Sequence, residues 1–155
     1  MLAEIRRDMQ TSSGLSRRQT PQAEPAKRRI MIVDDHPLVR RGLKAMINAE
    51  SDLVVCAEAA NTRDGLEAIS GAQPDLVIAD LSLGQADGLD LVRGISARHD
   101  GLPVLVLTMH EAPLHVRRAF AAGASGYVTK RDMTETLLEA IRSVLRGEKY
   151  GAPRN

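Results

Sequence analysis

The chain has 155 residues, a length typical of one ordinary domain with its own core. Lysine and arginine number 21 and aspartate and glutamate 20, so a net charge of +1 excludes a protein that acts mainly through bulk positive charge, such as a nucleic-acid coat. A hydrophobic fraction of 43% excludes a wholly disordered chain, and the single cysteine, Cys56, excludes an internal disulfide.

Residues 1–29 differ from the rest in charge and pattern. They carry seven cations against three acids, a net charge of +4, which leaves −3 for residues 30–155. Residues 10–26 are rich in small and polar side chains without an apolar period, so residues 1–27 are predicted to be a flexible tail; a basic contact arm is the alternative. The sequence shows neither a secretory signal nor an apolar run near ~18 residues, so we expect a cytoplasmic protein without membrane contact.

Five short apolar runs then alternate with helical patterns. The runs are rich in valine, isoleucine and leucine, which is typical of strands covered on both faces of a parallel sheet. In chain order, the predicted strands are Ile30–Val33, Leu53–Ala57, Leu76–Ala79, Val104–Leu107 and Gly126–Val128. The predicted helices follow them, at residues 39–47, 62–70, 87–98, 116–123 and 137–144. This alternation predicts a doubly wound α/β fold with right-handed crossovers.

The last predicted helix carries signals at both ends. Asp132 precedes Glu135 by three residues, a pattern close to a capping box, and Arg146 precedes Gly147, which is typical of a helix end. Cys56 lies in an apolar strand and is predicted to be an inert core thiol.

Polar side chains follow four of the predicted strands. Asp34 and Asp35 follow the first, Asp80 the third, Thr108 the fourth and Lys130 the fifth. Because parallel strands end at one edge of a sheet, these groups are expected to converge there. Two carboxylates about 4 Å apart repel by ~4 kcal/mol at a dielectric near 20, so Lys130 and a hard cation such as Mg²⁺ would compensate them. The set predicts phosphoryl transfer to the central Asp80, with Asp34 and Asp35 holding the metal.

In four blocks the sequence resembles a response-regulator receiver domain of two-component signalling, most closely the NarL/FixJ subfamily. The blocks are RRIMIVDDHPLVRRGL, PDLVIADLSLGQADGLDLV, PVLVLTMHEAP and AFAAGASGYVTKRD. The resemblance covers residues 28–150 and implies a flavodoxin-like (βα)5 sheet with strand order 2-1-3-4-5. Residues 151–155 are then expected to begin a linker or C-terminal tail.

The resemblance also implies a role for each residue around the acidic pair. Asp80 would be the phosphoacceptor. Asp35 would bind Mg²⁺ directly and Asp34 largely through water, and Asp80 and the backbone carbonyl of Ser82 would complete the protein's share of the metal site. A sensor histidine kinase, or a small phosphodonor, would supply the phosphoryl group.

The remaining implied roles concern the switch. Thr108 would turn toward the phosphoryl group, Lys130 would pair with its oxygens, and Tyr127 would be an aromatic side chain with inward and outward positions. The signal would leave through the fourth helix, fifth strand and fifth helix, and a homodimer through this face is also expected. Those segments are residues 111–122, 126–128 and 132–146.

Three positions depart from the family pattern. Gly84 stands where proline is frequent, although Gly88 retains the usual glycine, so the loop after Asp80 is expected to be less rigid. Arg131 follows Lys130 where proline is frequent, which puts a cis bond there in doubt. Met109 follows Thr108 where small residues are frequent, and we predict that it narrows access and slows loss of the phosphoryl group. His36, directly after the acidic pair, is interpreted as a surface histidine, and a place near the site is the alternative.

The sequence leaves open how the signal leaves the receiver. Relatives usually continue into a LuxR-type helix-turn-helix, so DNA contact is expected only through an output domain that this chain does not contain. An excised receiver that controls transcription and a stand-alone receiver acting through protein contacts both fit. A phosphate-independent interaction module and a Mg²⁺-dependent aspartyl-phosphate phosphatase are weaker alternatives. No enzymatic activity is expected beyond slow self-phosphorylation and autodephosphorylation.

Overall fold

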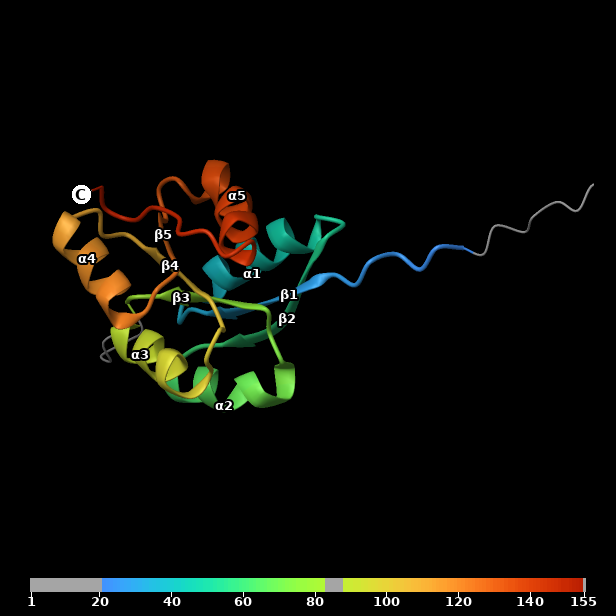
Figure 1. Cartoon of the computed structure of the whole chain (residues 1–155), viewed down its shortest axis with the longest axis horizontal. Coiled ribbons are helices and arrows are strands. Elements are labelled where there is room, and N and C mark those ends of the chain that lie inside the picture. Colours follow the sequence, from blue (N-terminus) through green and yellow to red (C-terminus); the bar gives the residue numbers. More distant parts are fainter. Residues whose placement is uncertain (1–20, 83–87, 155) are drawn as a thin grey trace, which may run out of the picture.

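A computed structural model of the chain describes residues 21–82 and 88–154, and this part forms a five-stranded parallel sheet with five helices (Figure 1). The strands are β1 (Arg28–Val33), β2 (Leu53–Ala59), β3 (Leu76–Asp80), β4 (Val104–Thr108) and β5 (Gly126–Thr129). The helices are α1 (Pro37–Asn48), α2 (Thr62–Ala72), α3 (Gly88–Arg98), α4 (Pro113–Ala122) and α5 (Met133–Leu145). The strand order β2-β1-β3-β4-β5 confirms the predicted flavodoxin-like topology.

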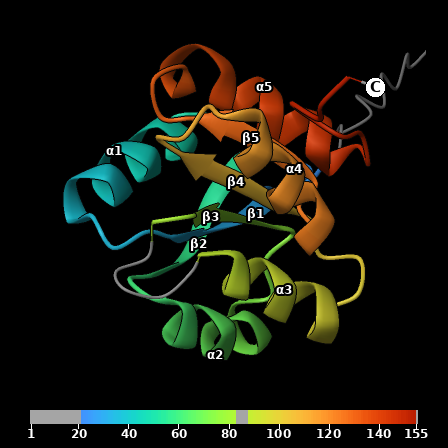
Figure 2. The same cartoon turned by 90° about the vertical axis from the view of Figure 1, so that its left-hand side faces the viewer.

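Helices cover both faces of the sheet, as Figure 2 shows for α1 and α5 on one side and α2 and α3 on the other. Alternate residues of β1 enter different cores. Ile30 and Ile32 pack with α1 and α5, whereas Met31 and Val33 pack with α2, α3 and α4. Because a strand alternates its side chains between faces, burial on both faces requires apolar residues at every position. This requirement explains the unbroken apolar runs.

The edge strand β2 is longer than predicted and continues two residues past Ala57, to Ala59. Glu58 interrupts the apolar pattern there, but among the described strands β2 has a neighbour on only one side, so a charged side chain is tolerated. The Lys44 ammonium of α1 lies 3.2 Å from the Glu58 carboxylate. Cys56 is half-buried in this strand, and burial raises the pKa of its thiol, as expected for an unreactive side chain.

The capping box predicted for α5 is wrong, although the helix does begin after Asp132. The Asp132 carboxylate accepts a hydrogen bond from the Thr129 hydroxyl at 2.9 Å and makes none to the first turn of the helix. Asp132 has a helical backbone conformation (φ −96°, ψ −2°) rather than the extended one that directs a cap side chain at the helix N–H groups.

The predicted end of α5 is confirmed. Gly147 has φ +86°, and its N–H donates to the Val144 carbonyl while the Glu148 N–H donates to the Ser143 carbonyl. This pair of hydrogen bonds is the Schellman arrangement, which requires the left-handed conformation that glycine adopts at least cost.

The segment after α5 returns to the sheet and runs beside β5. The Tyr127 N–H donates to the Tyr150 carbonyl at 2.9 Å, and the Tyr150 N–H donates to the Ser125 carbonyl at 3.1 Å. The Tyr150 side chain packs against the core that α1 and α5 share. Residues 148–151 therefore cover the outer edge of β5.

At the other end of the chain, residues 21–27 are exposed, lack regular structure and lead away from the domain (Figure 1). The rest of the predicted N-terminal tail and Gly84 of the predicted loop lie outside the described residues. Within the described ranges, no helix has the length and apolar character needed to cross a membrane.

Candidate functional site

The sheet order brings the predicted polar residues to one edge. Asp80 is the last residue of β3, which lies between β1 and β4. Asp34 follows β1, and Thr108 ends β4. Lys130 follows β5, where its N–H donates to the Thr108 carbonyl at 2.7 Å. The carboxyl ends of neighbouring parallel strands thus position residues that are distant in sequence.

Lys130 provides positive charge to two buried carboxylates. Its Nζ lies 3.1 Å from Asp34 Oδ2 and 3.1 Å from Asp80 Oδ2, and the exposed fractions of the Asp34 and Asp80 side chains are only 2% and 1%. Burial by itself lowers the pKa of Lys130, but Asp80 and Asp34 together outweigh it, so the pKa of the ammonium is raised. Lys130 is therefore a permanent cation at neutral pH.

The second oxygen of Asp80 is held by the start of the following loop. The Ser82 N–H donates to Asp80 Oδ1 at 3.0 Å, so both oxygens of the carboxylate have partners. The chain returns at Gly88, whose N–H donates to the Leu81 carbonyl at 3.1 Å. A Cβ at Gly88 would overlap the Leu81 backbone, so this position requires glycine. The role predicted for the Ser82 carbonyl stays a prediction.

His36 also lies on the carboxylate cluster. Its Nδ1 is 2.9 Å from Asp35 Oδ1, 3.0 Å from Asp34 Oδ1 and 3.8 Å from Asp80 Oδ2, although 57% of the side chain is exposed. The interpretation of His36 as a surface histidine away from the site is therefore wrong, and the alternative, a place near the site, is confirmed. The available signal was its place directly after the acidic pair, where the chain turns into α1 at Pro37.

The cluster offers the donor set of a divalent-cation site. Ligand atoms of Asp34, Asp35, His36 and Asp80 all lie within 4.8 Å of one another. Carboxylate oxygens are hard ligands, and a cation among them would relieve the repulsion that Lys130 only partly offsets. The residues present therefore fit a bound metal ion.

Thr108 and Tyr127 both contact the turn between β4 and α4 through His110. The buried Thr108 hydroxyl accepts a hydrogen bond from the His110 N–H at 3.2 Å. The Tyr127 hydroxyl donates to the His110 carbonyl at 2.5 Å. Burial raises the pKa of Tyr127, and a weaker interaction with Thr108 opposes the rise. The backbone of His110 is the part of this arrangement that sequence reasoning missed.

Two further predicted positions flank the site. Met109 is 64% exposed, and its control of access stays a prediction. The peptide bond between Lys130 and Arg131 is trans, like every other peptide bond in the described ranges. With this trans peptide bond, the Lys130 ammonium contacts Asp34 and Asp80. The Arg131 guanidinium lies 3.3 Å from the Glu111 carboxylate.

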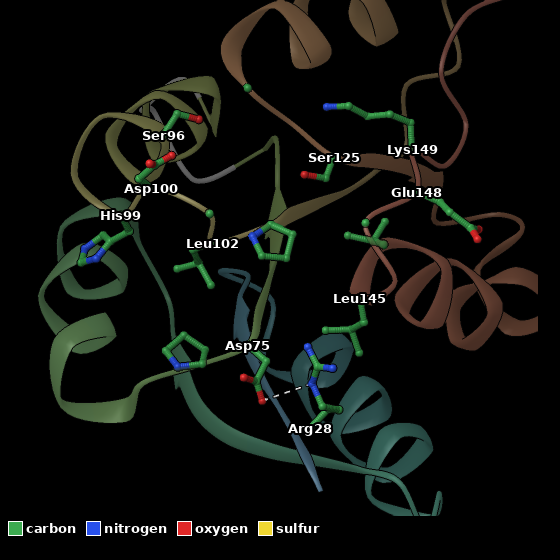
Figure 3. A pocket seen from close by; sticks show the side chains of 16 residues that line it. Arg28, Asp75, Ser96, His99, Asp100, Leu102, Ser125, Leu145, Glu148 and Lys149 are labelled. Atoms are coloured by element: carbon green, nitrogen blue, oxygen red, sulfur yellow. Dashed lines mark ion pairs between the residues drawn. The ribbon is translucent and has the colours of Figure 1, made fainter.

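A groove of about 690 Å³ opens at the opposite end of the sheet (Figure 3). It is lined mainly by residues at or near the amino ends of strands and the carboxyl ends of helices, and by Lys149 of the segment after α5. Arg28, the first residue of β1, lies there with its Nε 3.6 Å from Asp75 Oδ2. Its charges are of both signs. The carboxylate cluster, at the carboxyl ends of the strands, is the better candidate for the functional site.

Comparison with known proteins identifies the family to which the chain is similar. The sequence model of the response regulator receiver domain family matches residues 30–142. The chain is 35% identical over 136 residues to the nitrate/nitrite response regulator protein NarP of Escherichia coli K12. The aligned region covers 86% of this chain and 61% of NarP. It is 33% identical over 122 residues to a nitrate/nitrite response regulator homologue of Haemophilus influenzae, covering 79% of this chain and 59% of the relative.

A solved structure agrees with the fold as well. A two-component response regulator of the LuxR family from Aurantimonas sp. SI85-9A1 superimposes with a TM-score of 0.77 at 38% identity, covering 83% of this chain and 91% of that one. The chain spans about three-fifths of the length of the curated relatives that it matches.

Proposed function

This chain belongs to the response regulator receiver family, and we propose that it accepts a phosphoryl group on Asp80 from a sensor histidine kinase, with Mg²⁺ at the neighbouring carboxylates. One observation carries the proposal: the buried Asp80 carboxylate contacts Lys130 and lies beside Asp34, Asp35 and His36. A buried acid with a fixed ammonium on one side and a cation site on the other is suited to receive a negatively charged group.

In the proposed transfer, a carboxylate oxygen of Asp80 forms the bond to phosphorus, and the bond from phosphorus to the donor's imidazole nitrogen breaks. The donor histidine keeps that electron pair and takes up a proton. Lys130 is already 3.1 Å from Asp80 Oδ2, so its ammonium can pair with the incoming phosphoryl oxygens. Mg²⁺, when bound by Asp34, Asp35, Asp80 and the Ser82 carbonyl, offsets the negative charge of carboxylate and phosphoryl oxygens.

The phosphoryl group then changes the β4–α4 turn. It adds about −1.5 to −2 of charge beside Asp80. The Thr108 hydroxyl leaves the His110 N–H and turns toward the new oxygens, which frees one contact of the turn. Tyr127 loses its partner when the His110 carbonyl moves, and the face formed by α4, β5 and α5 repacks. A coupling of ~1–3 kcal/mol would change the affinity of a partner for this face about 5–150-fold.

We further propose that this face forms a homodimer and controls a transcription-regulating output in the cytoplasm. Two relatives whose names call them transcriptional regulatory proteins support that output. The receiver itself would show only slow self-phosphorylation and autodephosphorylation.

Intact-mass measurement after incubation with Mg²⁺ and acetyl phosphate tests the proposal. Wild type is expected to gain one phosphoryl group, Asp80→Asn none, and the exposed control Asp90→Asn as much as wild type. An adduct that persists in Asp80→Asn would refute the assignment. Repeated turnover of an organic phosphate ester would indicate a phosphatase, and the absence of any adduct would indicate a phosphate-independent interaction module.

A further inference from the structure

We propose that His36 is a nitrogen ligand of the divalent-cation site and makes this site favour first-row transition cations, such as Co²⁺ and Zn²⁺, more than three carboxylates alone would. The inference rests on the proposed function, since it concerns the same site, and it adds a residue that determines which cation the site prefers. Imidazole suits Zn²⁺, Cu²⁺, Fe²⁺ and Ni²⁺, whereas Mg²⁺ favours oxygen ligands.

The position of the ring matches that of a ligand. An ion with octahedral bonds of ~2.1 Å holds neighbouring ligand atoms about 3 Å apart. His36 Nδ1 lies 2.9 Å from Asp35 Oδ1 and 3.0 Å from Asp34 Oδ1. Its distance of 3.8 Å from Asp80 Oδ2 lies between the ~3 Å that separates adjacent ligands of such an ion and the ~4.2 Å that separates opposite ones. These three oxygens and the nitrogen can therefore surround one cation.

The Lys130 ammonium and the His36 ring meet different oxygens of Asp34. Lys130 contacts Asp34 Oδ2 and Asp80 Oδ2, whereas His36 lies against the other oxygen of Asp34. The backbone N–H of His36 donates to Asp34 Oδ1 at 2.8 Å, so this oxygen has a hydrogen-bond donor even without the imidazole ring. As a ligand, the ring would direct the Nδ1 lone pair to the ion and carry its proton on Nε2.

His36 is also a residue that can be replaced without loss of the fold. More than half of its side chain is exposed, and although it is the N-cap residue of α1, its side chain makes no capping hydrogen bond. The variant His36→Ala is therefore expected to keep the urea midpoint of wild type. His36→Gln offers a second variant that retains a polar side chain of similar length.

Calorimetric titration of the full chain with Co²⁺ and with Mg²⁺ separately tests the proposal. His36→Ala and His36→Gln are expected to lose at least ~10-fold in Co²⁺ affinity and to change Mg²⁺ affinity by less than ~3-fold. The visible absorption spectrum of bound Co²⁺ is expected to change in both variants. The control His99→Ala, on the loop before β4, is expected to match wild type.

Two results would overturn the role of His36. Unchanged Co²⁺ affinity would show that the ring is not a ligand, and tighter binding of both cations would show that a protonated ring only occupies the place of a cation. The outcome is separable from the phosphorylation proposal. A wild type that gains the Asp80 adduct but binds Co²⁺ independently of His36 refutes this inference alone. A wild type that gains no adduct but needs His36 for Co²⁺ supports it and refutes only the phosphoacceptor role.

Discussion

Replacement of Lys130 by methionine removes the ammonium from the carboxylate cluster and keeps most of the side-chain volume. Lys130 Nζ lies 3.1 Å from one oxygen each of Asp34 and Asp80. Both carboxylates are almost fully buried, so water cannot take the place of the ammonium without rearrangement. We expect the variant to fold but to be clearly less stable than wild type in the absence of divalent cations.

The distances set the size of the effect. At an effective dielectric near 20, the Lys130 ammonium attracts each carboxylate at 3.1 Å by about 5 kcal/mol. The cost of removing the lysine from water cancels part of the summed attraction. Removing one partner of a buried ion pair typically costs 3–5 kcal/mol. We expect the free energy of unfolding to fall by about 3 kcal/mol. With a urea dependence of about 2 kcal/mol per M, the midpoint would fall by about 1.5 M.

Urea unfolding followed by circular dichroism measures this loss, with Lys44→Met as the matched control. Lys44 is half-exposed and pairs with Glu58 at 3.2 Å, so its removal is expected to cost under ~1 kcal/mol. Added Mg²⁺ should restore more stability to Lys130→Met than to wild type, because the variant's carboxylates lack a counter-charge. Equal losses in the two variants, or equal responses to Mg²⁺, would refute the view that Lys130 compensates the cluster.

Three more perturbations have defined outcomes. Gly88→Ala should lower the free energy of unfolding by at least ~1 kcal/mol, because the added methyl group would meet the Leu81 backbone. Gly42→Ala, which has open space around it in α1, should raise the free energy of unfolding by roughly 0.5–1 kcal/mol. Urea midpoints compare the two variants. The hydrogen bond from Arg142 lowers the pKa of Asp52, so Asp52→Asn should cost roughly 0.5 kcal/mol at pH 7, and thermal melts should show this difference vanish as the pH falls through that lowered pKa. Met109→Ala should shorten the lifetime of the phosphorylated protein in an intact-mass time course, and an unchanged lifetime would contradict its role in access.

The sheet was predictable because burial on both faces leaves a strong trace in the sequence. Ile30–Val33 and Leu76–Ala79 read as unbroken apolar runs, and the structure places both inside the sheet. The end of β2 was not predictable from that trace, since Glu58 is polar and its place in a strand depends on backbone pairing with β1. The side chain of Asp132 was mistaken for a cap because its partner, Thr129, lies outside the helix.

The residues of the site were predictable where the end of a strand determines their position. Asp34, Asp80 and Lys130 come together because their positions follow from the strand order. The ring of His36 is a different case, because its contacts depend on a side-chain rotamer at a turn, which no apolar period encodes. Adjacency to Asp35 was the signal, but adjacency in the sequence does not determine which way the ring turns.

Tyr127 illustrates how one residue can serve the site and the fold through separate atoms. Its hydroxyl donates to the His110 carbonyl in the β4–α4 turn, while its N–H donates to the Tyr150 carbonyl in the segment beside β5. Rotation of the ring about the Cα–Cβ bond breaks the first contact and leaves the second in place. A change at the turn can therefore release the aromatic side chain without detaching residues 148–151 from the sheet edge, so the switch proposed for Tyr127 requires no unfolding of the strand that carries it.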